Sequence, residues 1–226
     1  QTKRRVISLD LPGFGLTGPF PDGDYRMSHY SAFLAHVLDQ LQVPRAVVAG
    51  NSFGGQLAWQ FALDHPQRVE RLVLVDAAGY PRNATSIPIG FRLAQIPALA
   101  PLMANLLPRQ MIEASIRNVY GDPDKVSDEL VDRYYELTLR TGNRQALRQR
   151  FIQADAGPSY NRIAELKVPT LIIWGGRDEL IPPANAERFK RDIKGSRLVL
   201  FDDLGHVPQE EDPARSVAVL IGFLEG

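Results

Sequence analysis

The stretch from Gly50 to Gly55, Gly-Asn-Ser-Phe-Gly-Gly, constrains the fold of this chain more than any other. It follows directly on the apolar run 46–49 and leads directly into a helical pattern at 56–63. A strand that ends in Gly-x-Ser-x-Gly and turns at once into a helix predicts a strained serine whose hydroxyl lies at the tip of a sheet. We therefore expect Ser52 to be a candidate nucleophile.

The neighbours of Ser52 suggest how such a tight turn forms. Gly50 and Gly54 lack a Cβ, so we expect strand and helix to approach each other closely there. The backbone N–H of Phe53 would lie in the first turn of the helix, where unpaired N–H groups and the helix dipole favour an anion. On the pentapeptide alone, a glycine-rich turn with an incidental serine is an equal interpretation. The choice depends on partner residues elsewhere in the chain.

Charge and cysteine content exclude several classes of protein. The 226 residues include 26 Lys and Arg and 26 Asp and Glu, so nothing favours nucleic acid or an anionic membrane as a partner. Cysteine is absent, which excludes disulfides, thiolate metal sites and a cysteine nucleophile. No apolar run approaches the roughly 20 residues of a membrane helix. We expect a soluble globular domain, with the compartment undecided and the cytoplasm favoured.

Strand-like and helix-like patterns alternate along most of the chain. Buried-strand patterns lie at Arg5–Leu9, Ala46–Ala49, Arg71–Val75, Val168–Trp174 and Arg197–Phe201. Helical patterns between and after them lie at 28–41, 56–63, 182–193 and 212–224. This alternation predicts an α/β fold with a mostly parallel sheet and helices on both of its faces.

The strand rhythm stops between residues 80 and 160, where only helical segments follow one another. Prolines divide the first part into short apolar pieces, and longer helices are expected at 111–119, after the N-cap Ser127, and at 143–152. We expect residues 80–160 to form a helical cap, or lid, on a core made of residues 1–79 and 161–226.

The segment from Gly13 to Gly18 matches the Gly-x-Gly-x-x-Gly fingerprint of dinucleotide-binding proteins. That fingerprint must open a helix whose N-terminus binds the pyrophosphate. Here Pro19 and Pro21 follow instead, and helical periodicity starts only near Ser28. We interpret the segment as a surface loop and expect no cofactor.

Two other groups of polar residues are expected to be surface features. His29 and His36 would lie about 10 Å apart along one helix at roughly 1.5 Å per residue, too far apart to bind one metal ion. We therefore expect no metal site. Four arginines of the 80–160 block could form a basic docking face, although the neutral total charge favours a solvated one; they are Arg140, Arg144, Arg148 and Arg150.

Three polar residues, Ser52, Asp178 and His206, lie just beyond the carboxyl ends of predicted strands. In an open α/β sheet these ends share one edge, where ligand sites form. A hydroxyl, a carboxylate and an imidazole in this order along the chain are the parts of a nucleophilic triad. Asp76 also follows a strand and is a rival for the acid, but we favour Asp178.

Four segments of the chain resemble the α/β-hydrolase fold family. They are Asp10-Leu11-Pro12-Gly13-Phe14-Gly15, Gly50-Asn51-Ser52-Phe53-Gly54-Gly55, Trp174-Gly175-Gly176-Arg177-Asp178 and Gly205-His206-Val207-Pro208. The resemblance implies acyl transfer to Ser52, with His206 taking the hydroxyl proton and Asp178 orienting the imidazole. It also implies that the backbone N–H of Phe53 donates to the oxyanion.

One departure from the family concerns the start of the chain. Family members usually have eight strands, and an early His-Gly loop supplies the second oxyanion N–H. Only five strand patterns are present here, and the first resembles the family's fourth. We therefore expect an N-terminal segment of the same protein, carrying the early strands and that loop, to be missing from this sequence.

The serine nucleophile implies a hydrolase of small or medium carboxylic esters, with a small-molecule ester or related acyl compound as its partner. The alternatives are a carbon–carbon bond hydrolase of ring-cleavage products, an enol-lactonase, a perhydrolase, or a ligand receptor with little turnover. The serine motif resembles the ring-cleavage branch, but Val207-Pro208 follows His206 where that branch would have Trp. Apolar residues of the expected cap would line an acyl or aryl pocket; they are Ile87, Ile89, Phe91, Leu93, Leu99, Leu102, Met103 and Leu106.

Overall fold

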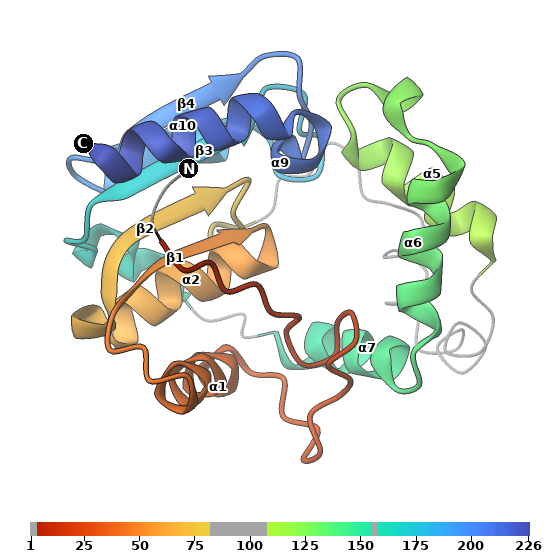
Figure 1. Cartoon of the computed structure of the whole chain (residues 1–226), viewed down its shortest axis with the longest axis horizontal. Coiled ribbons are helices and arrows are strands. Elements are labelled where there is room, and N and C mark those ends of the chain that lie inside the picture. The colour runs from red at the N-terminus through yellow and green to blue at the C-terminus, as the bar shows by residue number, and fades with distance from the viewer. Residues whose placement is uncertain (1–3, 82–107, 155–157) are drawn as a thin grey trace.

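A four-stranded parallel sheet forms the centre of the computed structural model, which describes residues 4–81, 108–154 and 158–226. The strands are β1 (Ala46–Asn51), β2 (Val69–Val75), β3 (Thr170–Gly175) and β4 (Arg197–Phe201), and they lie side by side in chain order. All three neighbouring pairs are parallel. The α/β fold predicted from the alternation of patterns is confirmed (Figure 1).

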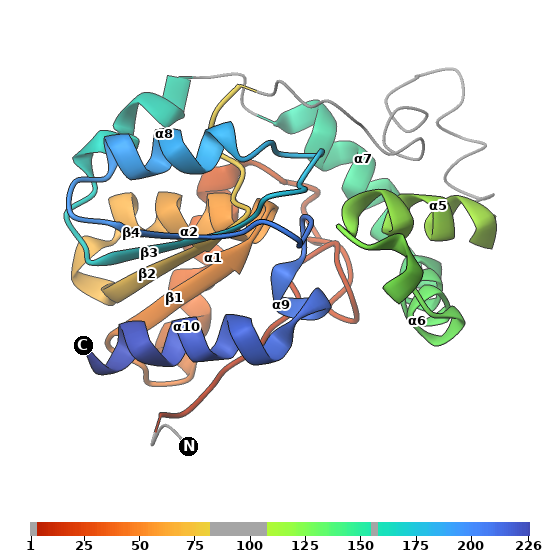
Figure 2. The same cartoon turned by 90° about the horizontal axis from the view of Figure 1, so that it is seen from above.

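Helices cover both faces of the sheet because strand side chains alternate between its two faces. On one face, Leu72, Leu74 and Trp174 pack in a core with α1 (Met27–Gln40), α2 (Phe53–Asp64) and α8 (Ala184–Asp192). On the other face, a smaller core is covered by α10 (Pro213–Glu225); its fully or nearly buried members are Val73, Leu171, Ile173, Phe201 and Leu204. Figure 2 shows α8 and α10 on opposite sides of the strands.

The remaining longer helices lie to one side of the sheet (Figures 1 and 2), and one of them, which contains Ala146, buries that residue in the first core. They are α5 (Arg109–Val119), α6 (Asp128–Leu139) and α7 (Asn143–Gln153). As predicted, Ser127 caps α6: its side chain accepts from the Leu130 N–H at 3.3 Å. Short helices complete the described chain: η1 (Pro66–Arg68), η3 (Pro123–Lys125), η4 (Pro158–Glu165) and α9 (Pro208–Glu211).

The strand predicted at Arg5–Leu9 is wrong for this structure. Residues 4–10 contain no strand and are exposed to solvent. Val6, for example, is 84% exposed. A strand forms only where a neighbouring strand pairs with its backbone N–H and C=O groups, and apolar residues alone do not supply that partner. In the described sheet β1 is an edge strand that pairs with β2 alone.

The segment from Gly13 to Gly18 is a loop, as predicted, and α1 begins only at Met27. Asp10 closes this loop: its carboxylate accepts from the Leu16 N–H at 2.9 Å and its C=O accepts from the Thr17 hydroxyl at 2.6 Å. A carboxylate in the centre of the loop would repel a pyrophosphate. The apolar residues expected to line a pocket, from Ile87 to Leu106, lie outside the described residues.

Candidate active site

Ser52 occupies the sharp turn between β1 and α2. Its backbone has φ 54° and ψ −115°, a conformation that residues other than glycine rarely adopt. Backbone hydrogen bonds hold it there: its N–H donates to the Val75 C=O at 3.0 Å, and its C=O accepts from the Gln56 and Ala78 N–H groups at 3.0 and 2.9 Å. The strain expected from the motif is therefore present and is held in place by the surrounding backbone.

Close contact between strand and helix depends on Gly50 and Gly55. A Cβ at Gly50 would lie 2.1 Å from the Gly54 C=O oxygen, and one at Gly55 would lie 2.5 Å from the Ala77 Cβ. A Cβ at Gly54 would meet nothing within 4 Å. The prediction for Gly50 is confirmed, whereas that for Gly54 is wrong. Gly55 faces Ala77 because it lies one residue further along the helix.

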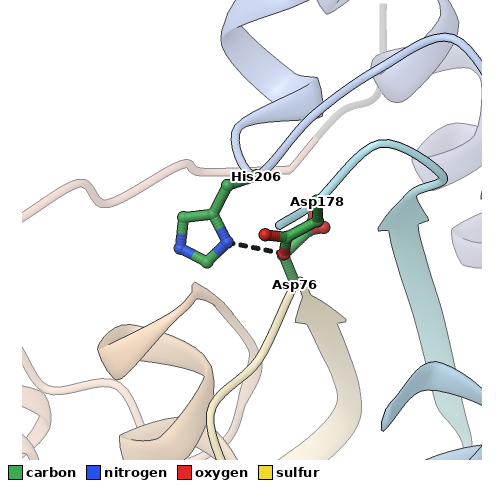
Figure 3. A group of neighbouring side chains, drawn as sticks. All are labelled: Asp76, Asp178 and His206. Carbon is green, nitrogen blue, oxygen red and sulfur yellow. Dashed lines mark hydrogen bonds and ion pairs between the residues drawn. The ribbon is translucent and has the colours of Figure 1, made fainter. Parts of the chain in front are cut away.

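His206 and Asp178 form a buried pair at the carboxyl ends of the strands. The Nδ1 atom of His206 lies 2.7 Å from the Asp178 Oδ2 atom (Figure 3). The other oxygen of Asp178 accepts from the Leu180 and Ile181 N–H groups, each at 2.9 Å. With one carboxylate oxygen held by the backbone and the other by the imidazole, Asp178 fixes both the orientation and the tautomer of His206.

The backbone of His206 is held from two directions. Its N–H donates to the C=O of Val119, at the end of α5, at 2.7 Å. Its C=O accepts from the Asn51 side-chain amide at 2.9 Å, which joins it to the residue just before Ser52. The structure thus places the turn with Ser52 and the loop with His206 against each other. The sequence pattern predicted no role for Asn51, although this residue directly precedes Ser52.

Glu211 braces the same loop, and no sequence signal pointed to it. Its carboxylate accepts from the Gly205 N–H at 2.7 Å and from the Gly121 N–H at 2.9 Å. Gly205 directly precedes His206, and Gly121 lies just beyond the C-terminus of α5. One buried carboxylate therefore ties the histidine loop to the helical segments beside the core.

Asp76 lies next to Asp178 but is not the hydrogen-bond partner of the imidazole. Side-chain ligand atoms of Asp76, Asp178 and His206 all lie within 4.8 Å of one another, and all three residues are buried (Figure 3). Burial, followed by the negative charge of Asp178, raises the pKa of Asp76 well above its ordinary value. A metal ion bound by this trio would have to displace the hydrogen through which His206 Nδ1 bonds to Asp178.

Aromatic rings and one arginine surround the residue after Ser52. The ring of Phe53 stacks on that of Phe14 with centroids 5.7 Å apart. The Arg150 guanidinium lies over Phe53, 4.5 Å from the ring centroid, and the side chain is half-buried. The expectation of a solvated face is therefore wrong for Arg150. Sequence periodicity could not find this contact, because Phe14, Phe53 and Arg150 come from three separate segments.

Similarity to known proteins identifies the fold family. The sequence profile of the α/β hydrolase fold matches residues 1–213. The chain belongs to the α/β-hydrolase fold family. Its resemblance to that family, predicted from four short segments, is thereby confirmed.

This α/β hydrolase is similar to a semialdehyde hydrolase, to a meta-cleavage product hydrolase and to an esterase. It is 31% identical to a 2-hydroxymuconate semialdehyde hydrolase from Pseudomonas putida, across 98% of this chain and 77% of the relative. A solved meta-cleavage product hydrolase from Pseudomonas fluorescens matches with a TM-score of 0.80 and 28% identity, covering 96% of this chain and 78% of its own. A thermophilic esterase from Thermogutta terrifontis matches with a TM-score of 0.77 and 25% identity over the same shares.

No helix in the described part of the chain has both the length and the apolar character needed to cross a membrane.

Proposed function

We propose that this α/β hydrolase cleaves a carbon–carbon bond next to a ketone or aldehyde carbonyl, using Ser52, His206 and Asp178. The observation that carries the proposal is the buried Asp178–His206 pair, 2.7 Å apart, set against the turn with Ser52 in a chain that resembles the Pseudomonas putida hydrolase along 98% of its length. The substrate named for that relative is 2-hydroxymuconate semialdehyde.

The chemistry of this substrate class defines the bond that breaks. A 2-hydroxymuconate semialdehyde contains a carboxylate, an enol and an aldehyde, but no ester, lactone or amide bond. Hydrolysis must therefore add water across a carbon–carbon bond: hydroxide goes to the carbonyl carbon, which becomes a carboxylate, and a proton goes to the departing carbon. A conjugated enol favours this reaction, because its keto form can hold the electron pair released when the bond breaks.

Each residue has a distinct role in this mechanism. The Ser52 Oγ attacks the carbonyl carbon while His206 takes its proton, and the backbone N–H of Phe53 donates to the oxyanion. His206 then gives the proton to the departing carbon, and water hydrolyses the acyl group left on Ser52. Asp178 keeps the imidazole oriented and stabilises its charged form. One oxyanion donor typically lowers the barrier by about 3 kcal/mol.

The cap is part of the same proposal. Residues 1–79 and 161–226 would form the catalytic core, and residues 80–160 a lid that excludes water from the bound substrate. Val119 accepts from the His206 N–H, and Gly121 donates to Glu211, which also accepts from the Gly205 N–H; Val119 and Gly121 belong to the proposed lid. Movement of the lid would therefore shift the backbone of His206, because the His206 N–H donates to Val119.

Ester hydrolysis, which the sequence favoured, is the second candidate. Two observations support it: Val207 follows His206 where the ring-cleavage branch would have Trp, and an esterase of known structure is 25% identical. The chemistry differs only in the departing group, because His206 would protonate an alkoxide oxygen rather than a carbon. The enol-lactonase and perhydrolase alternatives would use the same three residues.

A comparison of substrates tests the proposal. The wild-type chain, Ser52→Ala and a control, Ser28→Ala, are assayed with 2-hydroxymuconate semialdehyde and with a panel of p-nitrophenyl esters. Ser28 is exposed in the first turn of α1, so its loss leaves the site unchanged. We expect turnover of the semialdehyde to fall by about a thousandfold or more in Ser52→Ala and to persist in Ser28→Ala.

The other outcomes separate the candidates. Turnover of esters but not of the semialdehyde would replace the proposal with the second candidate. Binding of either compound without turnover would indicate a ligand receptor. Full activity of Ser52→Ala would refute a serine mechanism altogether.

A further inference from the structure

Asp76 occupies a place that a charged side chain could hardly tolerate. It directly follows β2, is fully buried with 0% of its surface exposed, and has a positive backbone φ of 42°. Its Oδ1 atom accepts from the Gly175 N–H at 2.9 Å, while its Oδ2 atom accepts no hydrogen bond from the described residues. Buried polar atoms are normally hydrogen-bonded, so an oxygen in this position needs an explanation.

A proton on Asp76 supplies that explanation. Two carboxylates this close in a buried site cannot both be ionised, so one of them keeps its proton. Both oxygens of Asp178 already have partners, because one accepts two backbone N–H groups and the other bonds to the imidazole. Asp76 accepts one N–H only. The proton therefore belongs on Asp76, where it turns an unpaired acceptor into a donor.

We propose that Asp76 is a positioning residue that stays protonated at neutral pH and donates a hydrogen bond to the Asp178 carboxylate, which holds His206. This inference rests on the proposed triad, because it concerns how the acid of that triad is held. A neutral donor stabilises the carboxylate without adding a charge to the site. It also joins the ends of β2 and β3, since the other Asp76 oxygen holds the Gly175 N–H.

The charged surroundings of Asp76 agree with this assignment. In the described part of the chain, the titratable groups that lie beside it or act on it are Asp178, His206 and Glu211. Burial raises the pKa of Asp76 most, and the negative charges of Asp178 and Glu211 and a hydrogen bond with the Asp178 side chain raise it further. The hydrogen bond from the Gly175 N–H acts in the opposite direction. Neutral Asp76 thus follows from both the hydrogen-bond geometry and the local charge.

Two substitutions of similar size separate a hydrogen-bond donor from a space-filling residue. Asp76→Asn keeps an N–H donor for Asp178 and a C=O acceptor for Gly175, whereas Asp76→Leu keeps neither. We expect Asp76→Asn to retain kcat within about threefold and to keep the wild-type pH profile of kcat/KM. We expect Asp76→Leu to lose at least tenfold in kcat/KM. Its acid limb should move to higher pH, because an Asp178 carboxylate without its donor attracts the imidazolium more strongly.

The pH profile is decisive because a merely structural role would not move it. Equal damage in both variants, or an Asp76→Leu profile that coincides with the wild type, would overturn the proposal. A lower melting temperature in Asp76→Leu with an unchanged acid limb would overturn it as well.

Infrared spectroscopy tests the proton directly and does not depend on the folding of Asp76→Leu. The difference spectrum between wild type and Asp76→Asn at neutral pH should contain the carbonyl stretch of one protonated carboxylic acid. The same band should be present in Ser52→Ala. Its absence from the wild type would refute the inference while leaving the triad possible. Conversely, an active Ser52→Ala protein with the band intact would refute the proposed function alone.

Discussion

Glu211 offers a direct test of how the loop that contains Gly205 and His206 is held, because each of its two carboxylate oxygens accepts from a different backbone N–H. Oε1 accepts from the Gly205 N–H at 2.7 Å and Oε2 from the Gly121 N–H at 2.9 Å, and the residue is only 9% exposed. Glu211→Gln keeps the shape of the side chain but replaces one acceptor oxygen with an NH₂ group. The variant can therefore satisfy only one of the two N–H groups.

The expected loss follows from that missing bond. A hydrogen bond to a charged group contributes about 1.5–3 kcal/mol, and a buried N–H left without an acceptor costs a similar amount. We expect Glu211→Gln to lower the free energy of unfolding by about 2–3 kcal/mol. In a chain of this size each kcal/mol corresponds to roughly 2–4 °C in Tm.

Glu210→Gln is the matched control. Glu210 is exposed and accepts from the Tyr134 hydroxyl at 2.9 Å, a bond that an amide oxygen can also accept. We expect that variant to change the free energy of unfolding by less than about 1 kcal/mol. Urea unfolding measures both variants, and kcat/KM should fall further in Glu211→Gln, because Gly205 adjoins His206. A loss in Glu211→Gln no larger than in the control would refute the bracing role.

Three further predictions follow from single positions. Because burial raises the pKa of Asp76, the folded chain keeps a proton that the unfolded chain releases above about pH 4. Urea unfolding from pH 4 to pH 8 should therefore show Asp76→Asn gaining stability over wild type, by up to about 1.4 kcal/mol per pH unit; a constant difference would contradict this. Gly55→Ala, whose Cβ would lie 2.5 Å from the Ala77 Cβ, should lose about 1–3 kcal/mol in the same assay. Gly54→Ala, whose Cβ would meet nothing within 4 Å, should leave the free energy of unfolding unchanged or raise it by up to about 1 kcal/mol. Equal losses of stability in Gly55→Ala and Gly54→Ala would show that the turn relaxes around the added methyl group. The free energy of unfolding of Ser52→Gly should exceed that of Ser52→Ala by about 1 kcal/mol, since glycine adopts φ 54° without strain. The reverse order would show that the turn stores no strain.

The sequence by itself determined the elements that local patterns encode. Alternation of apolar strands and amphipathic helices predicted the parallel sheet, and Ser127 as an N-cap placed the start of α6 correctly. The strand-turn-helix motif predicted the strained backbone of Ser52, because that conformation is set within a few residues of the serine. Likewise, the ends of two strands sufficed to predict that Asp178 and His206 would be neighbours, since parallel strands end at a common edge.

Tertiary structure alone decided everything that depends on a partner from another segment. Arg5–Leu9 has a strand pattern but no strand, because pairing requires a neighbour that local sequence does not reveal. The sequence left Asp76 and Asp178 as rivals, and only the packing paired the imidazole with Asp178 and left Asp76 in a buried position where its pKa is raised. The bracing by Glu211 and the position of Arg150 over Phe53 were invisible for the same reason. Contacts between segments depend on three-dimensional distance and desolvation, which periodicity along one segment does not encode.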